Sequence, residues 1–449
     1  MRVTIIGGGS YQWGPKLVVD LLGTPSLAGM DLVLEDIDAD AARTLAAYAE
    51  RAAEVMGAKA TVSATTDQRR ALEGADYVVV TISTGGFRSM AVDLDVPAAH
   101  GIKQSVGDSV GPGGISRALR NIPVLVGIAR DMEQVCAGAW MLNITNPMTC
   151  LTRAVARETT VPVVGLCHEV ENFCMDMAIA FGKAHTALRP VVAGVNHFPL
   201  VTELDVEGAD GLGLLLDMVD ELGGLEALRP APGQEPAEPF SRLDFARRHV
   251  LKLAILDRFG ALPAAGDRHV AEFLPGILTE QAGWGASWGI ALTPIADRQR
   301  HQDEYVAEVA SALAGKEDIP TWASGELVAP VIDSLITGTR REAPLNIPNT
   351  GQCPDIPLDA VVESMCSVEA GRIAGRDVAS APPALAELLR RHAAVQELTV
   401  QAAVSGDRSL AEAAFVLDPL AGRIDWRELD AMVDQLLAGA AEWLPHFAR

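Results

Sequence analysis

The chain has 449 residues, of which 49% are hydrophobic and 21% are charged. This composition is typical of a globular protein, and the length is enough for two packed domains. The formal net charge of −23 argues against binding to nucleic acid or to an anionic membrane surface. The sequence contains no run of about eighteen apolar residues, the length that a helix needs to cross a bilayer. The first residues, MRVTIIGGGS, are expected to form a strand rather than a secretory signal.

The first third of the sequence alternates between strand-like and helix-like segments. Short apolar segments predict strands at Val3–Ile6, Asp31–Leu34, Tyr77–Ser83, Trp140–Ile144 and Val161–Leu166. An apolar-periodic segment that ends at Leu22 and an Ala-rich segment, Ala39–Met56, predict helices between them. This alternation favours an α/β fold with a doubly wound parallel sheet. We place this Rossmann-like domain at residues 1–170.

The remainder of the chain, residues 171–449, is expected to form a second domain. Its pattern changes to longer helices, loops rich in proline and glycine, and few clear strands. The stretch RPAPGQEPAEP at residues 229–239 is expected to be an exposed excursion. Long amphipathic helices are predicted at Ala384–Val404 and Trp426–Trp443.

A glycine-rich loop between the first strand and the first helix indicates a dinucleotide site. Gly7 and Gly9 match the first two glycines of G-x-G-x-x-G, although Gln12 stands in place of the third. Glycine lets the backbone, with Ser10, approach a pyrophosphate at a helix N-terminus. The next strand ends in acids, of which Asp36 would accept hydrogen bonds from ribose hydroxyls and favour NAD over NADP.

Two polar loops, Thr84-Gly85-Gly86 and Thr145-Asn146-Pro147, follow two other predicted strands. The carboxyl ends of parallel strands meet at one edge of a sheet, where ligands bind. We therefore expect Thr84 and Gly85 to contact the cofactor as well.

Cys167 and His197 each follow an apolar run, in VVGLCHEV and VAGVNHF. Free cysteine is among the most buried residue types, so a purely structural role is the ordinary explanation. The alternative is a metal site, because thiolate and imidazole can hold a divalent ion and leave positions open for substrate. The six cysteines show no CxxC spacing, which indicates neither a disulfide framework nor a zinc ribbon and fits a reducing cytoplasm.

Eight short motifs occur along the chain in one order and spacing. They are VTIIGGGS, LEDID, SVGDSVGPGGISRALRNIPV, NITNPM, GLCHEV, GVNHF, FGALPAAGDRHVAEFLPG and NIPNTG. Together they resemble glycoside hydrolase family 4, the NAD- and manganese-dependent glycosidases. The resemblance implies a lactate/malate-dehydrogenase-like Rossmann domain, a mixed α/β C-terminal domain for substrate, metal and oligomer contacts, and a homodimer or homotetramer.

The chemistry of this family is an exception to the usual pair of glycosidase carboxylates. The resemblance implies that NAD takes a hydride from C3 of the sugar, so that the C2 proton becomes acidic and a base removes it. A metal on the C2 and C3 oxygens stabilises the enolate, and the aglycone leaves by elimination. Water then adds and NADH returns the hydride, which leaves no net redox change.

The resemblance also assigns roles to matching residues. Cys167 and His197 would hold the manganese, which resolves the open question about them in favour of a metal site. Asn146 would hydrogen-bond a sugar hydroxyl. Asp108, in the glycine-rich stretch GDSVGPGG, would protonate the departing oxygen.

The base that removes the C2 proton is harder to assign. Several family members use a tyrosine in the segment that matches Phe259–Gly276, but this segment contains none here. Asp267 and His269 are its ionisable candidates, and burial could raise the pKa of a carboxylate base toward neutrality. We expect Asp267 to be the base.

The four residues C-H-E-V, from Cys167 to Val170, resemble those of the α-galacturonidases in the family. His168, as a substrate-contacting residue directly after the cysteine, disfavours a phosphosugar. The substrate implied is an α-linked galacturonide from a short pectin fragment. Its carboxylate needs a cation, ideally an arginine. The candidates close to the motifs are Arg88, Lys103, Arg117 and Arg268, and the sequence does not choose among them.

Three other functions fit parts of this pattern. A 2-hydroxyacid dehydrogenase would share the fold, but we find no His/Asp pair with dehydrogenase spacing. A glycosidase of the same mechanism would act instead on a glucuronide, a glucoside or a sulfoquinovoside. A non-catalytic, NAD-responsive sensor would keep the fold without turnover.

Overall fold

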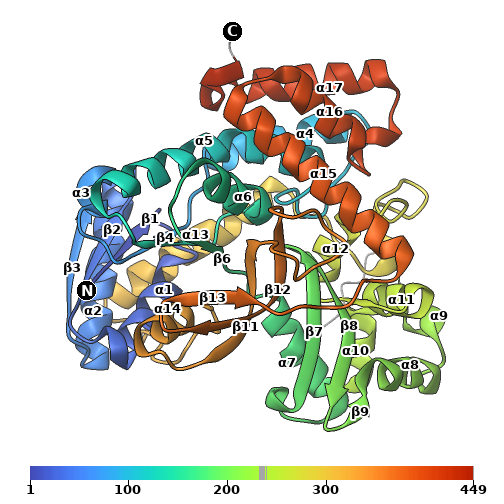
Figure 1. Ribbon diagram of the computed structural model, residues 1–449, viewed down its shortest axis with the longest axis horizontal. Helices are drawn as coiled ribbons and strands as arrows, with labels where there is room; N and C mark the ends of the chain where they lie inside the picture. The colour runs from blue at the N-terminus through green and yellow to red at the C-terminus, as the bar shows by residue number, and fades with distance from the viewer. Residues whose placement is uncertain (232–237, 239, 448–449) are drawn as a thin grey trace.

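The computed structural model describes residues 1–231, 238 and 240–447. Most of the predicted exposed excursion at 229–239 therefore lies outside the described residues. Figure 1 shows one sheet running through the molecule, with helices on both of its faces.

The first half of the chain forms the parallel part of the sheet. Its strands are β1 (Arg2–Ile6), β2 (Met30–Glu35), β3 (Ala60–Thr65), β4 (Tyr77–Val80), β5 (Trp140–Asn143) and β6 (Val163–Gly165). They lie in the order β3-β2-β1-β4-β5-β6, and each pairs in parallel with its neighbour. This is the strand order of a Rossmann fold, so the predicted fold class is confirmed. The sequence pattern missed β3, whose residues are mostly half-buried or exposed.

Helices cover both faces of the parallel strands, which explains why these strands are almost continuously apolar. The helices are α1 (Gly14–Leu22), α2 (Ala39–Met56), α3 (Gln68–Leu72), α4 (Gly86–Ala99), α5 (Gly111–Val135) and α6 (Met148–Glu158), with a short 3₁₀ turn, η1 (Pro25–Leu27). In Figure 1, α5 and α6 lie on one side of the sheet and α1 on the other. Two separate buried clusters, one on each face, form the core of this half.

The second half of the chain adds further strands to the same sheet, so the prediction of few clear strands after residue 170 is wrong. These strands are β7 (Leu188–Val195), β8 (Phe198–Val206), β9 (Ala209–Asp210), β10 (Leu262–Pro263), β11 (Arg341–Pro348), β12 (Val361–Glu369) and β13 (Arg372–Gly375). The sheet continues because Asn346 of β11 pairs antiparallel with Gly165 of β6. The domain boundary at residue 170 stays a prediction.

The remaining helices surround these added strands. They are α7 (Glu169–Phe181), α8 (Gly211–Glu221), α9 (Leu225–Leu228), α10 (Arg242–Arg248), α11 (Val250–Phe259), α12 (Asp267–Phe273), α13 (Ile295–Leu313), α14 (Val328–Thr337), α15 (Pro383–Ser405), α16 (Arg408–Leu417) and α17 (Trp426–Gly439). Short 3₁₀ turns are η2 (His185–Ala187), η3 (Ala286–Trp288), η4 (Ala421–Arg423), η5 (Ala441–Trp443) and η6 (Pro445–Phe447). The two long helices predicted near the end of the sequence correspond to α15 and α17.

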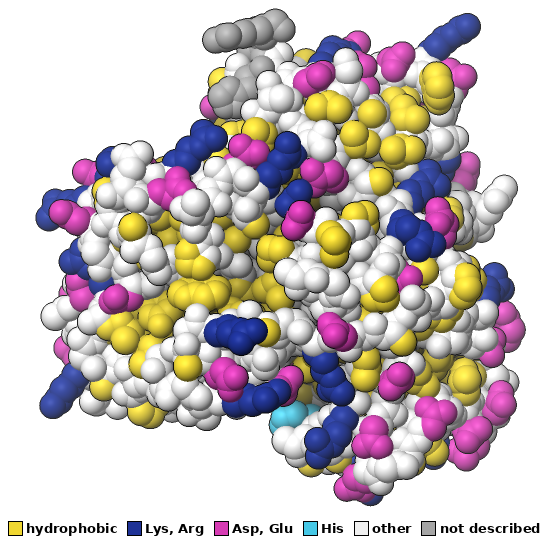
Figure 2. All heavy atoms as spheres, in the orientation of Figure 1, with side chains coloured by type: hydrophobic (Ala, Val, Ile, Leu, Met, Phe, Trp, Pro, Cys, Tyr) yellow, Lys and Arg dark blue, Asp and Glu magenta, His cyan; other side chains and the backbone are white. Residues whose placement is uncertain are grey.

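The surface carries charges of both signs. On the face drawn in Figure 2, Lys and Arg side chains are interspersed with Asp and Glu, and apolar side chains gather over the region of α15 to α17. Among the described residues, no helix combines the length and the hydropathy needed to cross a bilayer.

Candidate active site

A cavity of about 1190 Å³ lies at the carboxyl edge of the parallel strands and collects most of the predicted site residues. All the predicted cofactor residues line it, namely Gly7, Gly9, Ser10, Asp36, Thr84 and Gly85. The same cavity is lined by Asp108, Arg117, Asn146, Asp267, Arg268 and His269. The cofactor residues and the proposed chemical groups therefore share one space.

The glycine loop is held tightly against the second strand. The N–H groups of Gly7 and Gly8 both donate to the Glu35 carbonyl oxygen, at 2.9 and 2.7 Å. Gly7 has φ +84°, and a Cβ there would lie 1.9 Å from the Thr81 carbonyl oxygen, so only glycine fits. The close packing expected of a third glycine is made by Gly14, where a Cβ would lie 2.9 Å from Leu45 Cδ1.

The acid at the end of β2 contacts this loop, and its predicted contact with a ribose stays a prediction. Asp36 Oδ2 accepts a hydrogen bond from the Gly9 N–H at 3.0 Å, and Oδ1 accepts from the Asp38 N–H at 2.9 Å. The second loop is anchored differently, because the Thr84 N–H donates to Asn121 Oδ1 at 3.1 Å. Hydrogen bonds within the protein thus hold both loops.

Asp108, His197 and His269 form the centre of the site. Their potential ligand atoms all lie within 4.8 Å of one another, and the two imidazole rings are 3.7 Å apart between centroids. Each His Nδ1 lies 3.9 Å from Asp108 Oδ1. One carboxylate and two imidazoles at this separation could hold a divalent metal.

A hydrogen-bond chain orients His197 toward this centre. Ser109 Oγ donates to Asp108 Oδ1 at 2.7 Å and lies 2.7 Å from His197 Nδ1. Since the hydroxyl has one proton, His197 donates from Nδ1, which leaves Nε2 free as a ligand. His197 adopts φ +66° in the two-residue turn between β7 and β8. Such a conformation is strained for a residue other than glycine and is typical of functional positions.

A buried carboxyl group on α12 accepts hydrogen bonds from the backbone just before Asp108. Glu272 Oε1 accepts hydrogen bonds from the Val106 N–H at 2.6 Å and the Gly107 N–H at 2.9 Å, and Ser105 Oγ lies 3.2 Å away. Burial raises the pKa of Glu272 to about 7. The role of Glu272 is not apparent from the sequence, because it depends on contacts with a distant loop.

The ionisation of Asp108 reflects its neighbours. Burial alone would raise its pKa, but His269, His197 and Arg117 together hold the pKa below the ordinary value. Asn146 Nδ2 donates to Asp108 Oδ2 at 3.2 Å, and the buried Asn146 Oδ1 has no hydrogen-bond partner within the described chain. An ionised Asp108 suits a role beside a cation. To protonate a departing oxygen it must first take up a proton.

Cys167 is buried next to this centre, outside the group of three. The thiol lies beside Asn196, which precedes His197, and near Glu169 and Glu363. Burial, reinforced by these two carboxyl groups, raises the pKa of the thiol well above its ordinary value. Its assignment as a metal ligand stays a prediction.

Glu169, the third letter of C-H-E-V, is half-buried, lines the cavity and anchors the backbone of another segment. Its Oε2 accepts a hydrogen bond from the Gly266 N–H at 2.6 Å. Although burial raises its pKa, His269, His197 and His168 lower it to about 2. Glu169 therefore ties the start of α7 to the start of α12, which carries His269.

Asp267, the expected base, contacts two residues of α11. Its Oδ2 accepts a hydrogen bond from the Leu251 N–H at 3.0 Å, and Oδ1 lies 3.8 Å from Lys252 Nζ. Burial raises the pKa of Asp267 to about 6 despite Lys252. A carboxyl group with such a pKa is suited to proton transfer near neutral pH.

The candidate cations separate into two groups. Arg117 and Arg268 line the cavity, as does Arg298 of α13, which the sequence analysis did not single out. Arg298 Nη2 donates to the Val106 carbonyl oxygen at 2.7 Å, and its Nε donates to the Thr293 carbonyl oxygen at 3.4 Å. Arg298 is therefore fixed against the loop that carries Asp108.

The other two candidate cations, Arg88 and Lys103, and the predicted substrate contact His168 do not line the cavity themselves, although Arg88 and His168 contact residues that do. Arg88 is exposed and pairs with Glu442 at 2.9 Å. Lys103 Nζ lies over the ring of Trp284, 5.0 Å from its centroid. His168 packs near Trp13, with its Nδ1 3.3 Å from a Glu326 oxygen. None of these geometries brings the side chain to the centre of the site.

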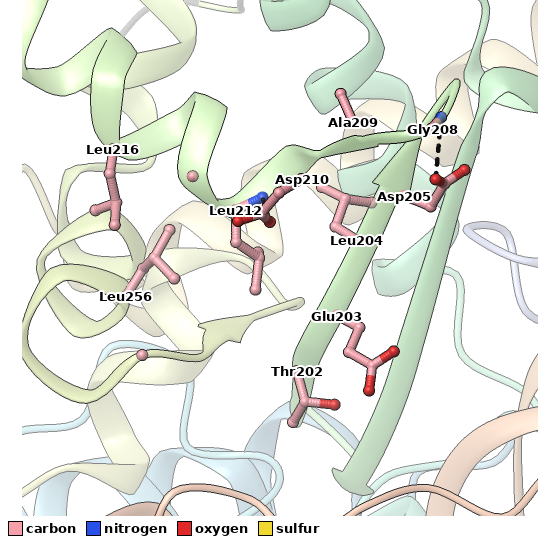
Figure 3. A pocket seen from close by; sticks show the side chains of 12 residues that line it. Thr202, Glu203, Leu204, Asp205, Gly208, Ala209, Asp210, Leu212, Leu216 and Leu256 are labelled. Atoms are coloured by element: carbon pink, nitrogen blue, oxygen red, sulfur yellow. Dashed lines mark hydrogen bonds between the residues drawn. The ribbon is translucent and has the colours of Figure 1, made fainter.

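A second, open cavity of about 500 Å³ lies between β8, β9, α8 and α11 (Figure 3). Two of its acidic side chains accept hydrogen bonds from backbone N–H groups. Asp205 Oδ2 accepts from the Gly208 N–H at 3.0 Å, and Asp210 Oδ1 accepts from the Leu212 N–H at 3.1 Å. The predicted site residues all lie elsewhere, so the larger cavity is the candidate active site.

These features define a Rossmann-type α/β protein in which one cavity joins a glycine-rich loop to a cluster of ionisable side chains. Comparison with known families identifies it further. The model of the family 4 glycosyl hydrolases matches residues 2–182, and that of their C-terminal domain matches residues 192–421. The chain belongs to family 4 of the glycosyl hydrolases and is a glycosidase.

Similar proteins include two from Bacillus subtilis. An α-galactosidase is 29% identical over 99% of this chain and 99% of its own length. An α-galacturonidase is 30% identical over 97% of each chain. The crystal structure of lplD from Bacillus subtilis has a TM-score of 0.87 at 29% identity and covers 97% of this chain and 99% of its own. A malate dehydrogenase from Plasmodium falciparum, at a TM-score of 0.52 and 12% identity over 92% of this chain and 99% of its own, shares the fold alone.

Proposed function

We propose that the protein hydrolyses α-linked galacturonides, with NAD and a divalent metal such as Mn²⁺ as cofactors. Two similar proteins have almost the same sequence identity to this chain but are named for different sugars. The α-galactosidase, at 29%, is named for a neutral sugar, and the α-galacturonidase, at 30%, for an acidic one. Overall identity therefore does not separate the two substrates. The choice depends on charge at the site.

The arginines that line the cavity are the observation that supports an acidic sugar as the substrate. In the described part of the chain, Arg117, Arg268 and Arg298 form no ion pair with a carboxylate, although the protein has 59 acidic residues. Burial lowers the pKa of Arg117 and Arg298, which still stay charged at neutral pH. Asp108 acts on both of these guanidinium groups, so one carboxylate faces two cations that are costly to bury, and a second anion would lower that cost, whereas Arg268 is exposed. A uronate carboxylate supplies that anion.

The residues present fit both cofactors. The glycine loop and Asp36 offer a dinucleotide its usual contacts, the pyrophosphate at the loop and a ribose at the acid. His197, with its free Nε2, would hold the metal together with the predicted ligand Cys167, and Asp108 and His269 lie within reach of the same ion. Crystal structures of two 6-phospho-glucosidases, one from Thermotoga maritima and one from gut microorganisms, contain NAD and manganese, at 20% and 21% identity to this chain.

The proposed reaction uses the chain's own residues for positioning and proton transfer. When bound, NAD supplies reversible hydride acceptance at C3 of the sugar, which acidifies the C2 proton, and the metal supplies positive charge beside the sugar oxygens. Asp267 takes the C2 proton, and the electron pair forms a C1–C2 double bond as the C1–O bond breaks. Asp108 would first take up a proton from solvent and then give it to the departing oxygen. Water then adds its hydroxyl to C1 and a proton to C2, and the hydride returns to C3, so the sum is hydrolysis without net redox change.

The test of the proposal is a comparison of two aryl glycosides, the α-galacturonide and the α-galactoside, each with and without NAD, Mn²⁺ and a chelator. We expect the galacturonide to be hydrolysed with a kcat/KM at least about tenfold higher, because a buried charge-assisted hydrogen bond contributes roughly 1.5–3 kcal/mol. Activity should require both NAD and metal. Preference for the galactoside would refute the acidic substrate, and activity without NAD would refute the mechanism.

A further inference from the structure

Trp443 lines the large cavity although it lies far from the other lining residues in the sequence. It belongs to η5, directly after α17, and α17 packs beside α4 (Figure 1). The indole ring reaches the second cofactor loop. A Cβ built on Gly85, which has φ +81°, would lie 2.7 Å from Trp443 Cε2, so the ring rests directly on this glycine.

The segment that carries Trp443 contacts α4 through the exposed side chain of Arg88. Arg88 Nη2 donates to Glu442 Oε2 at 2.9 Å, and the Arg88 guanidinium carbon lies 5.2 Å from the centroid of the Trp443 ring. The backbone N–H of Trp443 donates to the Ala440 carbonyl oxygen at 2.9 Å. Arg88 thus contacts the segment Ala441–Trp443, which gives it a role other than binding the substrate carboxylate.

We propose that Trp443 is part of the cofactor site and packs against NAD where the dinucleotide passes the loop Thr84–Gly86. The inference rests on the NAD dependence proposed above. A large aromatic surface at the wall of a cleft excludes water and offers a flat face to the ligand. Of the seven tryptophans, Trp13 and Trp443 line the cavity in the described structure, so energy transfer from Trp443 to bound NADH can be measured.

The experiment compares NAD affinity and energy transfer in three variants of the full chain. Trp443→Ala should weaken NAD binding in calorimetry by about fivefold to tenfold, as expected for a lost aromatic contact. Trp443→Phe keeps a ring and should bind NAD within about twofold of the wild type. It should nevertheless lose the Trp443 share of the energy transfer to bound NADH and keep the share of Trp13, the other tryptophan of the described cavity lining. The control is Trp426→Ala, since this residue is 70% exposed at the start of α17, the helix that precedes η5.

Two outcomes would overturn the inference, and they can be told apart. If the wild type binds NAD and both Trp443 variants match it in affinity and in energy transfer, Trp443 lies away from the cofactor. If the wild type itself does not bind NAD, the proposed function fails and the inference fails with it. Should Trp443→Ala not fold, the energy transfer in Trp443→Phe decides alone.

Discussion

Replacing His197 by asparagine should lower kcat/KM about a hundredfold to a thousandfold, as expected when one member of a preorganised charged site is removed. Its imidazole lies 3.7 Å from that of His269 between centroids and is oriented by Ser109. Without it, the proposed metal loses a nitrogen ligand at the centre of the site. Bound manganese, measured by atomic emission after dialysis, should fall in parallel.

The choice of asparagine keeps the backbone of the turn. His197 has φ +66°, and asparagine tolerates this left-handed conformation better than alanine does. NAD affinity should stay unchanged, because the cofactor loops are separate from the turn. The matched control is His185→Asn in η2, an exposed histidine that does not line the cavity. Wild-type activity and metal content in His197→Asn would refute the assignment of the metal site.

Replacing Arg298 by glutamine should separate the acidic from the neutral substrate. We expect kcat/KM for the aryl α-galacturonide to fall about tenfold to a hundredfold, which corresponds to the loss of one charge-assisted hydrogen bond. Activity on the aryl α-galactoside should change little, because that sugar has no carboxylate to pair. The effect should lie mainly in KM if the contact is equally strong in the ground state and the transition state.

The control for Arg298 lies two residues along the same helix. Arg300 is exposed and pairs with Glu304 at 2.9 Å, so Arg300→Gln should leave both activities as in the wild type. Equal losses on both substrates in Arg298→Gln would contradict the proposal. They would show that Arg298 only holds the Asp108 loop through the Val106 carbonyl oxygen.

The cofactor half of the site was predictable because its signals are local. A strand, a glycine loop and a helix follow one another in sequence, and the acid Asp36 ends the next strand. The mismatch at Gln12 is explained by packing, since Gly14 makes the close approach to Leu45 instead. Among the added strands, β11 was missed because it contains Pro344 and ends at Pro348, which read locally as a loop.

The substrate half was only partly predictable because it is assembled by tertiary contacts. Asp108, Asn146 and His269 come from three different segments, and only their motif context indicated a shared site. Arg298 lies on α13 beyond these motifs, and its place depends on how that helix packs against α2 and α4. The sequence also does not specify which face of α4 lines the cavity.

Deuterium at C2 of the product tests the central claim most directly, namely that the glycosidic bond breaks by elimination after removal of the C2 proton. The aryl α-galacturonide is hydrolysed in D₂O with NAD and Mn²⁺, and the galacturonic acid is examined by NMR. The account predicts deuterium at C2, because the proton added there comes from solvent. Hydrolysis that proceeds fully with protium retained at C2 would contradict it.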